Sequence, residues 1–269
     1  MNAGAHLLET SWSGSSAVEG GASAAATGAG AHPPRRRRRA TPGVLLRHAS
    51  LALALLPALL VACDPYVKGN GILREETRSV GAFEGLRVED GIHAEVTAGA
   101  ESQRVVVSGD ENLLQHVQTS VRADPVHGQV LEVRSSLSSF ESTHPLRVVV
   151  SVPVFRFIAA TDGCHAVVAG VATDVMAVEA DDGADLVLSG AGGDQLTLRL
   201  AGGKGGGAFL DARGYPAGVA TVELAGGARA ELRVEDRVGG IVSGPSSLEN
   251  VGGGACELTV TPDATVTCP

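Results

Sequence analysis

The chain has 269 residues, of which 44% are hydrophobic and only 3% aromatic, and it contains 36 glycines. Such a chain can bury a sizeable core of Val, Leu and Ala, whereas a globular enzyme of this length normally uses more Phe, Tyr and Trp. Residues 1–63 carry six Arg and two Glu, which leaves 15 basic and 28 acidic residues, a net charge of −13, in the remainder. An acidic surface repels phosphates, which argues against nucleic acid as a partner.

The N-terminal residues have the composition of a targeting segment. Residues 1–43, which are rich in Ala, Gly and Ser and include the run Arg35 to Arg39, have no apolar period and are expected to be disordered. The arginines precede an apolar stretch over residues 44–62, as the basic region of a secretory signal does. An upstream over-extension of the reading frame would also explain the run, and nucleic-acid binding is the less favoured alternative.

The apolar stretch ends in Leu60-Val61-Ala62-Cys63, which resembles the bacterial lipoprotein lipobox. In that motif the cysteine is acylated, with chains such as palmitate, and becomes the new N-terminus. We therefore expect residues 44–63 to be a lipoprotein signal peptide and Cys63 to be the lipidation site. Ordinary signal cleavage, with Cys63 as a spare cysteine, is the alternative. The expected location is the cell envelope, at the outer membrane or on its periplasmic face, with the membrane contacted through the lipid anchor.

The segment after Cys63 predicts irregular strands. Residues 64–82 are expected to form a tether. Alternation of apolar and polar residues then predicts half-buried strands at 85–88, 93–97, 104–108, 117–122 and 130–134. Residues 111–116, which follow Asp110, predict one helical turn inside a loop.

A repeat occupies the centre of the chain. A short apolar run meets a glycine at Gly163, Gly183 and Gly203, a spacing of 20 residues each time, and a weaker copy follows at Gly227. Equal spacing gives units of equal shape, which stack because one coil alone cannot bury its apolar side. The predicted fold class is therefore all-β, a β-solenoid.

A family resemblance agrees with the repeat. Phe83 to Val96, the turn Gly109 to Leu113, and the return through residues 130–133 and 146–153 resemble the head GIN domain family, over about residues 80–250. Members are bacterial envelope proteins of unknown function that are often labelled auto-transporter adhesins. The resemblance implies a right-handed parallel β-helix over residues 83–255, frequently on lipoproteins, without established catalytic residues.

The C-terminal residues 256–269 contain two cysteines. Cys256 and Cys268 flank the turn Thr261 to Asp263, so a hairpin would place them opposite one another, within reach of a disulfide. An oxidising, exported location favours this bond, which would protect the terminal edge of the solenoid. The remaining Cys164 is expected to be a small buried side chain rather than a reactive thiol.

Acidic residues on the repeat turns are the first candidates for chemistry. A ladder of aspartates on successive turns could bind Ca²⁺ or cleave a polysaccharide with paired carboxylates; it would comprise Asp162, Asp181, Asp182 and Asp185. Asp beside Gly is also ordinary turn chemistry, and this interpretation is favoured because the aligned position in the next coil is Gly202. We therefore expect no metal or cofactor, and keep Asp162, Asp182 and Asp185 as weak metal candidates.

Two histidines are the second candidates. His93 and His165 each lie two residues after the glycine of an Asp-Gly pair. If those coils stacked, the imidazoles could share a metal with Cys164. Separate surface histidines are the favoured interpretation, because the two positions are 72 residues apart in the sequence.

The sequence favours binding over catalysis. It contains no nucleophile elbow, phosphate-binding loop or two-cysteine zinc pair. We expect a lipid-anchored envelope protein, not an enzyme, whose solenoid offers a binding or scaffold surface to an extended partner such as a glycan or an envelope protein. The alternatives are a carbohydrate-active β-helix enzyme that uses the stacked aspartates, and a surface adhesin, which rests on the family label alone.

Overall fold

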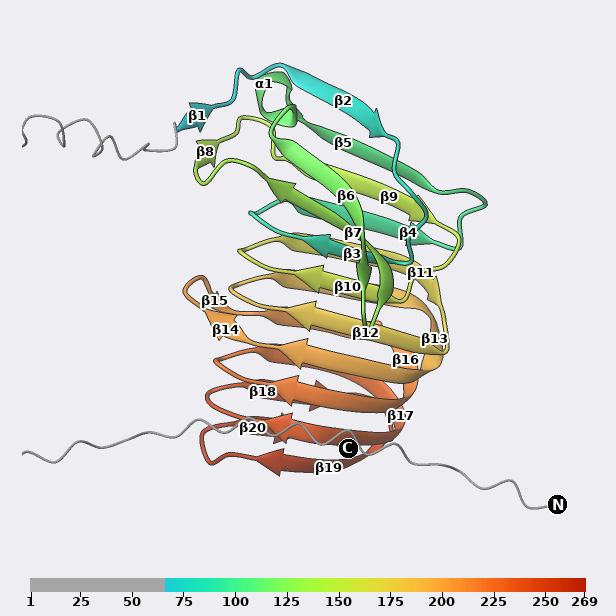
Figure 1. Cartoon of the computed structure of the whole chain (residues 1–269). Helices are drawn as coiled ribbons and strands as arrows, with labels where there is room; N and C mark the ends of the chain where they lie inside the picture. Colours follow the sequence, from blue (N-terminus) through green and yellow to red (C-terminus); the bar gives the residue numbers. More distant parts are fainter. Residues whose placement is uncertain (1–65) are drawn as a thin grey trace, which may run out of the picture. The chain divides into compact units, whose positions relative to one another are not determined.

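The computed structural model describes residues 66–269, which form part of one compact unit. The expected disordered segment 1–43, the signal peptide 44–63 and the lipidation site Cys63 lie outside the described residues. Within the described part, strands stack into a β-solenoid of about six turns, as the repeat predicted (Figure 1). The one described helix, α1 (Glu111–Leu114), is the expected helical turn after Asp110.

Each coil contributes one strand to each of two faces, and strands in neighbouring coils pair in parallel. We call the first the hairpin face; it contains β3 (Gly85–Val88), β10 (Phe157–Ala160), β12 (Val175–Ala180), the second halves of β13 (Asp185–Leu200), β16 (Phe209–Leu224) and β17 (Arg229–Val242), and β19 (Ala255–Val260). The second, the histidine face, contains β4 (His93–Ala98), β11 (His165–Ala172), the first halves of β13, β16 and β17, β18 (Ser247–Asn250) and β20 (Thr265–Thr267).

The core lies between the two faces because residues along each strand alternate between inward and outward positions. One inward column of the hairpin face consists of residues that are at most 1% exposed: Leu86, Ile158, Val178, Leu198 and Val222. Small and branched aliphatic side chains stack on their equivalents in the next coil, which explains the scarcity of aromatic residues.

Asp-Gly pairs form the sharp corners between the faces. Both residues have positive φ at Asp162-Gly163 (56° and 70°) and at Asp182-Gly183 (49° and 78°), and Gly226-Gly227 repeats the conformation (65° and 86°). Glycine and aspartate are among the residues that tolerate this left-handed region. The corners predicted at Gly163, Gly183 and Gly227 are therefore present.

The corner predicted at Gly203 is different. There β14 (Gly202–Gly203) and β15 (Gly206–Gly207) form a small antiparallel excursion. The excursion lengthens this coil, so that Asp185 pairs with Phe209, whereas His165 pairs with Asp185 after the regular 20 residues. Later coils are shorter, since Arg229 pairs with Ser247. Stacking tolerates these changes because extra residues are accommodated at corners and not in strands.

The N-terminal strands close one end of the solenoid. The remaining strands are β1 (Val67–Lys68), β2 (Leu73–Arg78), β5 (Arg104–Asp110), β6 (Val117–Asp124), β7 (Gly128–Ser135), β8 (Phe140–Glu141) and β9 (Arg147–Val152). Strand β9 pairs in parallel with β4, β5 pairs antiparallel with β9, and β2 pairs antiparallel with β5. Residues 64–82 are expected from the sequence to form a tether, but part of this segment forms β2. Strand β2 covers the edge of β5 that would otherwise be unpaired.

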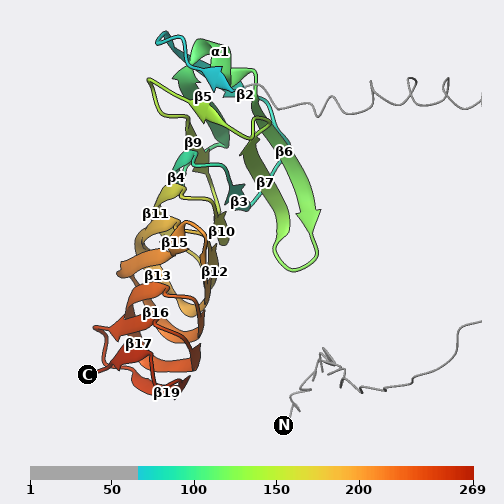
Figure 2. The ribbon, with the colours of Figure 1, turned by 90° about the vertical axis from the view of Figure 1, so that its left-hand side faces the viewer.

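Strands β6 and β7 form a hairpin that lies outside the stacked coils. Strand β7 pairs in parallel with β3 and antiparallel with β6. The hairpin then extends past the edge of β3 alongside the hairpin face, as the turned view shows (Figure 2). Its turn, at residues 125–127, is the element that shapes the candidate binding surface.

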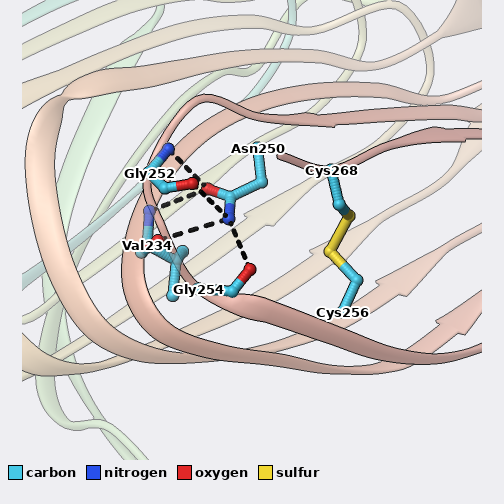
Figure 3. The surroundings of a disulfide bond; sticks show 6 residues. All are labelled: Val234, Asn250, Gly252, Gly254, Cys256 and Cys268. Carbon is cyan, nitrogen blue, oxygen red and sulfur yellow. Dashed lines mark hydrogen bonds between the residues drawn. A yellow bond between two sulfur atoms is a disulfide. The ribbon is translucent and has the colours of Figure 1, made fainter.

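The C-terminal segment forms a last coil and not the expected hairpin. Strand β19 pairs in parallel with β17, and β20 pairs in parallel with β18, so the two strands lie on different faces. The predicted disulfide between Cys256 and Cys268 is present, with 6.4 Å between the Cα atoms (Figure 3). It joins the two faces within the last coil. A full coil here takes 18 residues, from Ser247 to Thr265, and the segment from Cys256 to Cys268 provides most of the last one.

Candidate binding surface

The aspartates of the proposed ladder hold corners together. The carboxylate of Asp162 accepts a hydrogen bond from Thr161 Oγ1 at 2.9 Å, and that of Asp181 accepts one from the Asp182 amide at 2.7 Å. The carboxylate of Asp182 accepts the amide of Gly205. Asp162 and Asp182 occupy neighbouring corners, because the Gly163 amide donates to the Asp182 carbonyl at 3.0 Å. In residues 66–269 no group of three His, Cys, Asp or Glu side chains is arranged to hold a metal.

The two histidines lie side by side despite their separation in sequence. Since β4 pairs with β11, the ring centroids of His93 and His165 are 5.9 Å apart, with 62° between the ring planes. Nδ1 of His165 lies 3.2 Å from Asp185 Oδ2, so Asp185 accompanies this pair. Cys164 is fully buried in the core, and burial raises the pKa of its thiol to about 12. It therefore does not complete a His-His-Cys group, and the thiol stays protonated.

A charged cluster on the histidine face is internally satisfied. Glu231 is only 6% exposed and is paired with both Arg229 and Arg213. Arg213 also holds Asp211, with 2.7 Å between Nη2 and Oδ2, which lowers the pKa of that carboxyl. Since each arginine is already paired with a carboxylate, this cluster strengthens the sheet and leaves few groups for a ligand.

The turn of the β6–β7 hairpin is held against the hairpin face by two stacked rings. The imidazole of His127 lies on the phenyl ring of Phe157, with 3.8 Å between centroids and 6° between planes. The Arg87 guanidinium lies 5.7 Å from the centre of the same phenyl ring. The turn itself is shaped by Asp124, whose Oδ1 accepts the amides of Val126 and His127 at 2.8 and 2.9 Å. These bonds lower the pKa of Asp124.

A groove runs along the outward side of the hairpin face beneath this turn. Val126 and His127 bound a hollow of about 300 Å³, in which the outward residues Ala177, Thr197 and Thr221 occupy successive coils. One rim carries charged side chains from the same three coils, namely Glu179, Arg199 and Glu223.

A second hollow of about 310 Å³ adjoins the first. It shares Glu179 and Arg199 with it and extends to Arg87, Thr161 and Asp181. We call the two hollows together the hairpin groove. Its side chains occupy equivalent positions in successive coils, and the threonine at 197 is repeated at 221 in the next coil.

Comparison with known proteins adds a family to this geometry. Residues 82–254, well over half of the chain, match the family model described as "Putative auto-transporter adhesin, head GIN domain". The chain belongs to the head GIN domain family. This match confirms the resemblance noted in the sequence. The description of the family as an adhesin supports a surface or binding role. No protein with curated annotation matches the chain.

Solved structures resemble this head GIN domain in fold. A "putative adhesin" from Bacteroides fragilis has a TM-score of 0.58 at 14% identity, and the match covers 75% of this chain and 99% of that one. A second "putative adhesin", from Parabacteroides merdae, has a TM-score of 0.46 at 17% identity, covering 75% and 98%. A "putative lipid binding protein" from Parabacteroides distasonis has a TM-score of 0.49 at 12% identity, covering 76% and 100%. At these identities the first match supports the fold alone.

The head GIN domain has a further cavity between strand β7 and residues that flank the N-terminal strands. It has a volume of about 580 Å³, and its lining includes Phe83, Gln103, Gln129, Pro153 and Val154. Most of this lining is apolar. The hairpin thus contributes to two separate depressions: its turn lines the hairpin groove, and Gly128 and Gln129 of strand β7 line this cavity.

Sequence reasoning missed the hairpin groove. His127 lies 30 residues before Phe157, and nothing in the local pattern indicates that the two rings stack. The only available signal was the sequence Asp124-Pro125-Val126-His127-Gly128, which predicts a tight turn between two strands but not where that turn packs.

Proposed function

We propose that this chain is an exported, lipid-anchored envelope protein that binds an extended partner in the hairpin groove and does not catalyse a reaction. The observation that carries the proposal is the groove itself. Its outward side chains come from successive coils in register, and Val126, which is 80% exposed, overhangs it. A rigid surface with repeated groups suits many weak contacts to one long ligand.

The anchor is assigned to Cys63 from the lipobox-like sequence. Among residues 66–269, the structure has no helix that is long and apolar enough to cross a bilayer. An acylated Cys63 would lie three residues before Tyr66, where the described fold begins. Incorporation of labelled palmitate into the wild-type chain but not into Cys63→Ala tests the anchor. Equal labelling of both chains would refute it.

The hydrogen bonds of the corner aspartates support the proposal of a non-catalytic role. The carboxylates of Asp162 and Asp182 are used in turns, and neither belongs to a described group of three potential ligands. The rival proposal is a carbohydrate-active enzyme that uses these residues. Asn tolerates the left-handed backbone of both positions, so Asp162→Asn with Asp182→Asn should leave the fold intact. Loss of a glycan-cleaving activity in this double variant would favour the enzyme.

Adhesion to another cell is a second candidate, favoured by the description of the family. In this alternative the partner lies on another cell and not in the bacterial envelope, while the groove that binds it is the same. Binding to isolated host cells but not to bacterial envelopes would distinguish it.

Blocking the groove tests the proposal directly. Thr197→Arg places a long charged side chain on the groove floor, whereas Thr97→Arg makes the same change on the histidine face, where Thr97 is equally an outward, exposed strand residue. Binding to isolated bacterial envelopes, measured with Cys63→Ser chains, should fall at least tenfold for Thr197→Arg only. Equal binding by both variants would show that the hairpin groove is not the binding surface.

A further inference from the structure

We propose that the ligand of the hairpin groove is an uncharged, extended glycan. This inference rests on the proposed function and specifies its partner.

The groove residues repeat with the spacing of the coils. Thr197 pairs with Thr221 in the next coil, and Arg199 pairs with Glu223. Neighbouring strands lie about 4.8 Å apart, so equivalent strand positions recur at that interval along the solenoid axis. A single unit of an extended polysaccharide has a similar length. A polymer of repeating units can therefore make equivalent contacts on successive coils.

The repeated groups are ones that bind hydroxyls. The floor carries the Thr197 and Thr221 hydroxyls, and the adjoining column carries a guanidinium and carboxylates. Hydroxyl groups both donate and accept, so sugars can bind threonine, carboxylate and guanidinium groups alike. The apolar side chain of Val126 and the methyl of Ala177 offer contacts for the C–H faces of a sugar ring.

Four of the five acidic and basic side chains that line the hairpin groove form opposite-charge pairs, and the fifth, Asp181, leaves one net negative charge. Arg87 Nη2 lies 3.6 Å from Glu179 Oε2, and Arg199 Nε lies 3.7 Å from Glu223 Oε2. All four side chains are partly or largely exposed, with between 30% and 69% of their surface accessible. A polyanion that approached a guanidinium would be repelled by the carboxylate beside it. A polycation that approached a carboxylate would be repelled by the guanidinium beside it. Paired opposite charges therefore favour a neutral ligand.

An extended peptide is a poorer match for this surface. Peptides that bind as strands pair their backbone with a free sheet edge. The strands beneath the groove have no free edge, since β12 pairs with both β10 and β13, and β13 pairs with β16 on the same face. Recognition on the floor of the hairpin groove must therefore use side chains, which suits a polyhydroxylated ligand better than a polypeptide.

The first experiment separates the partner classes. Isolated bacterial envelopes are treated with protease or with periodate, which oxidises vicinal diols, and binding of the Cys63→Ser chain is measured. Binding that survives protease and is lost after periodate is the expected result. Binding that is lost after protease would overturn the glycan inference while leaving the proposed surface function intact. Absence of binding to untreated envelopes would instead refute the proposed function.

The second experiment identifies the charge and the groove residues. Oligosaccharides released from the envelopes are separated by anion exchange into a neutral and an acidic pool, and each competes with envelope binding. The neutral pool should compete, and its affinity should fall about tenfold in Thr197→Val with Thr221→Val, because two hydrogen bonds are lost. Thr97→Val is the matched control on the histidine face. Competition by the acidic pool alone, or an equal loss in the control, would overturn the inference.

Discussion

At the scale of single residues, Asn250 shows how a buried side chain completes an irregular corner. Asn250 is 3% exposed, and its Oδ1 accepts the amides of Val234 and Gly252 at 2.9 and 3.2 Å. Its amide nitrogen donates to the carbonyls of Val234 and Gly254 at 3.2 and 3.3 Å (Figure 3). One side chain thus satisfies backbone groups that the bend in β17 and the loop after β18 leave without strand partners.

Replacing this side chain tests its contribution to stability. Asn250→Leu has a similar volume but removes both the donor and the acceptor, so buried backbone groups lose their partners. We expect the free energy of unfolding to fall by about 3 kcal/mol, as measured by denaturant titration. The exposed neighbour change Glu249→Gln should alter it by less than about 0.5 kcal/mol. A similar, small effect of both changes would mean that water replaces the Asn250 amide.

At the scale of elements, the β6–β7 hairpin depends on the ionised form of Asp124. Because backbone amides donate to its carboxylate, its pKa in the folded chain is lowered. At a pH above about 3.9, the pKa of Asp in an unfolded chain, the ionised carboxylate stabilises the turn. This stabilisation is lost as the pH falls through the lower pKa of the folded chain.

Acidification should therefore loosen the hairpin turn. Between pH 5 and pH 2.5, hydrogen-exchange protection of residues 117–135 should decrease in the wild-type chain. In Asp124→Asn the decrease should be smaller, because the amide side chain does not titrate. The same decrease in both chains would assign the effect to other carboxylates.

The last coil depends on the Cys256–Cys268 disulfide. Strand β20 has only three residues, and it pairs with β18 alone. In a solenoid each coil contacts only its neighbours, so loss of the bond should loosen the last coil and not the whole molecule. Cys256→Ala with Cys268→Ala should cost up to about 3 kcal/mol and increase hydrogen exchange in β19 and β20 only. Increased exchange throughout the solenoid would show that the coils unfold as one unit.

Local patterns predicted the strands and most corners, because alternation and Asp-Gly pairs are encoded within a few residues. Gly203 misled the prediction because glycines at 202, 203, 205, 206 and 207 leave the position of the corner unspecified. The spacing of Cys256 and Cys268 fits both a hairpin and a short coil. Pairing with the strands of the preceding coil selects the coil. The stacking of His127 on Phe157, and with it the groove, depends on contacts between distant segments that no local pattern encodes.

At the scale of the whole molecule, the two faces of the solenoid have different surfaces. On the histidine face the charged cluster around Glu231 is internally paired, whereas the hairpin face has a groove, an overhanging turn and exposed apolar residues. Val126, which lines this groove, is 80% exposed, and Val175, which lies on β12 two residues before the lining residue Ala177, is 49% exposed. Val251 and Val260, near the last coil, are exposed to a similar degree, at 52% and 43%, and lie outside the groove lining.

Hydroxyl-radical footprinting compares these four valines in one measurement on the Cys63→Ser chain, with and without isolated bacterial envelopes. If the hairpin groove holds the partner, labelling of Val126 and Val175 should fall at least threefold, because the ligand excludes solvent there, while labelling of Val251 and Val260 stays constant. Protection of Val251 and Val260 with unchanged labelling of Val126 and Val175 would contradict the account, because the partner would then lie at the end of the solenoid and not on its hairpin face.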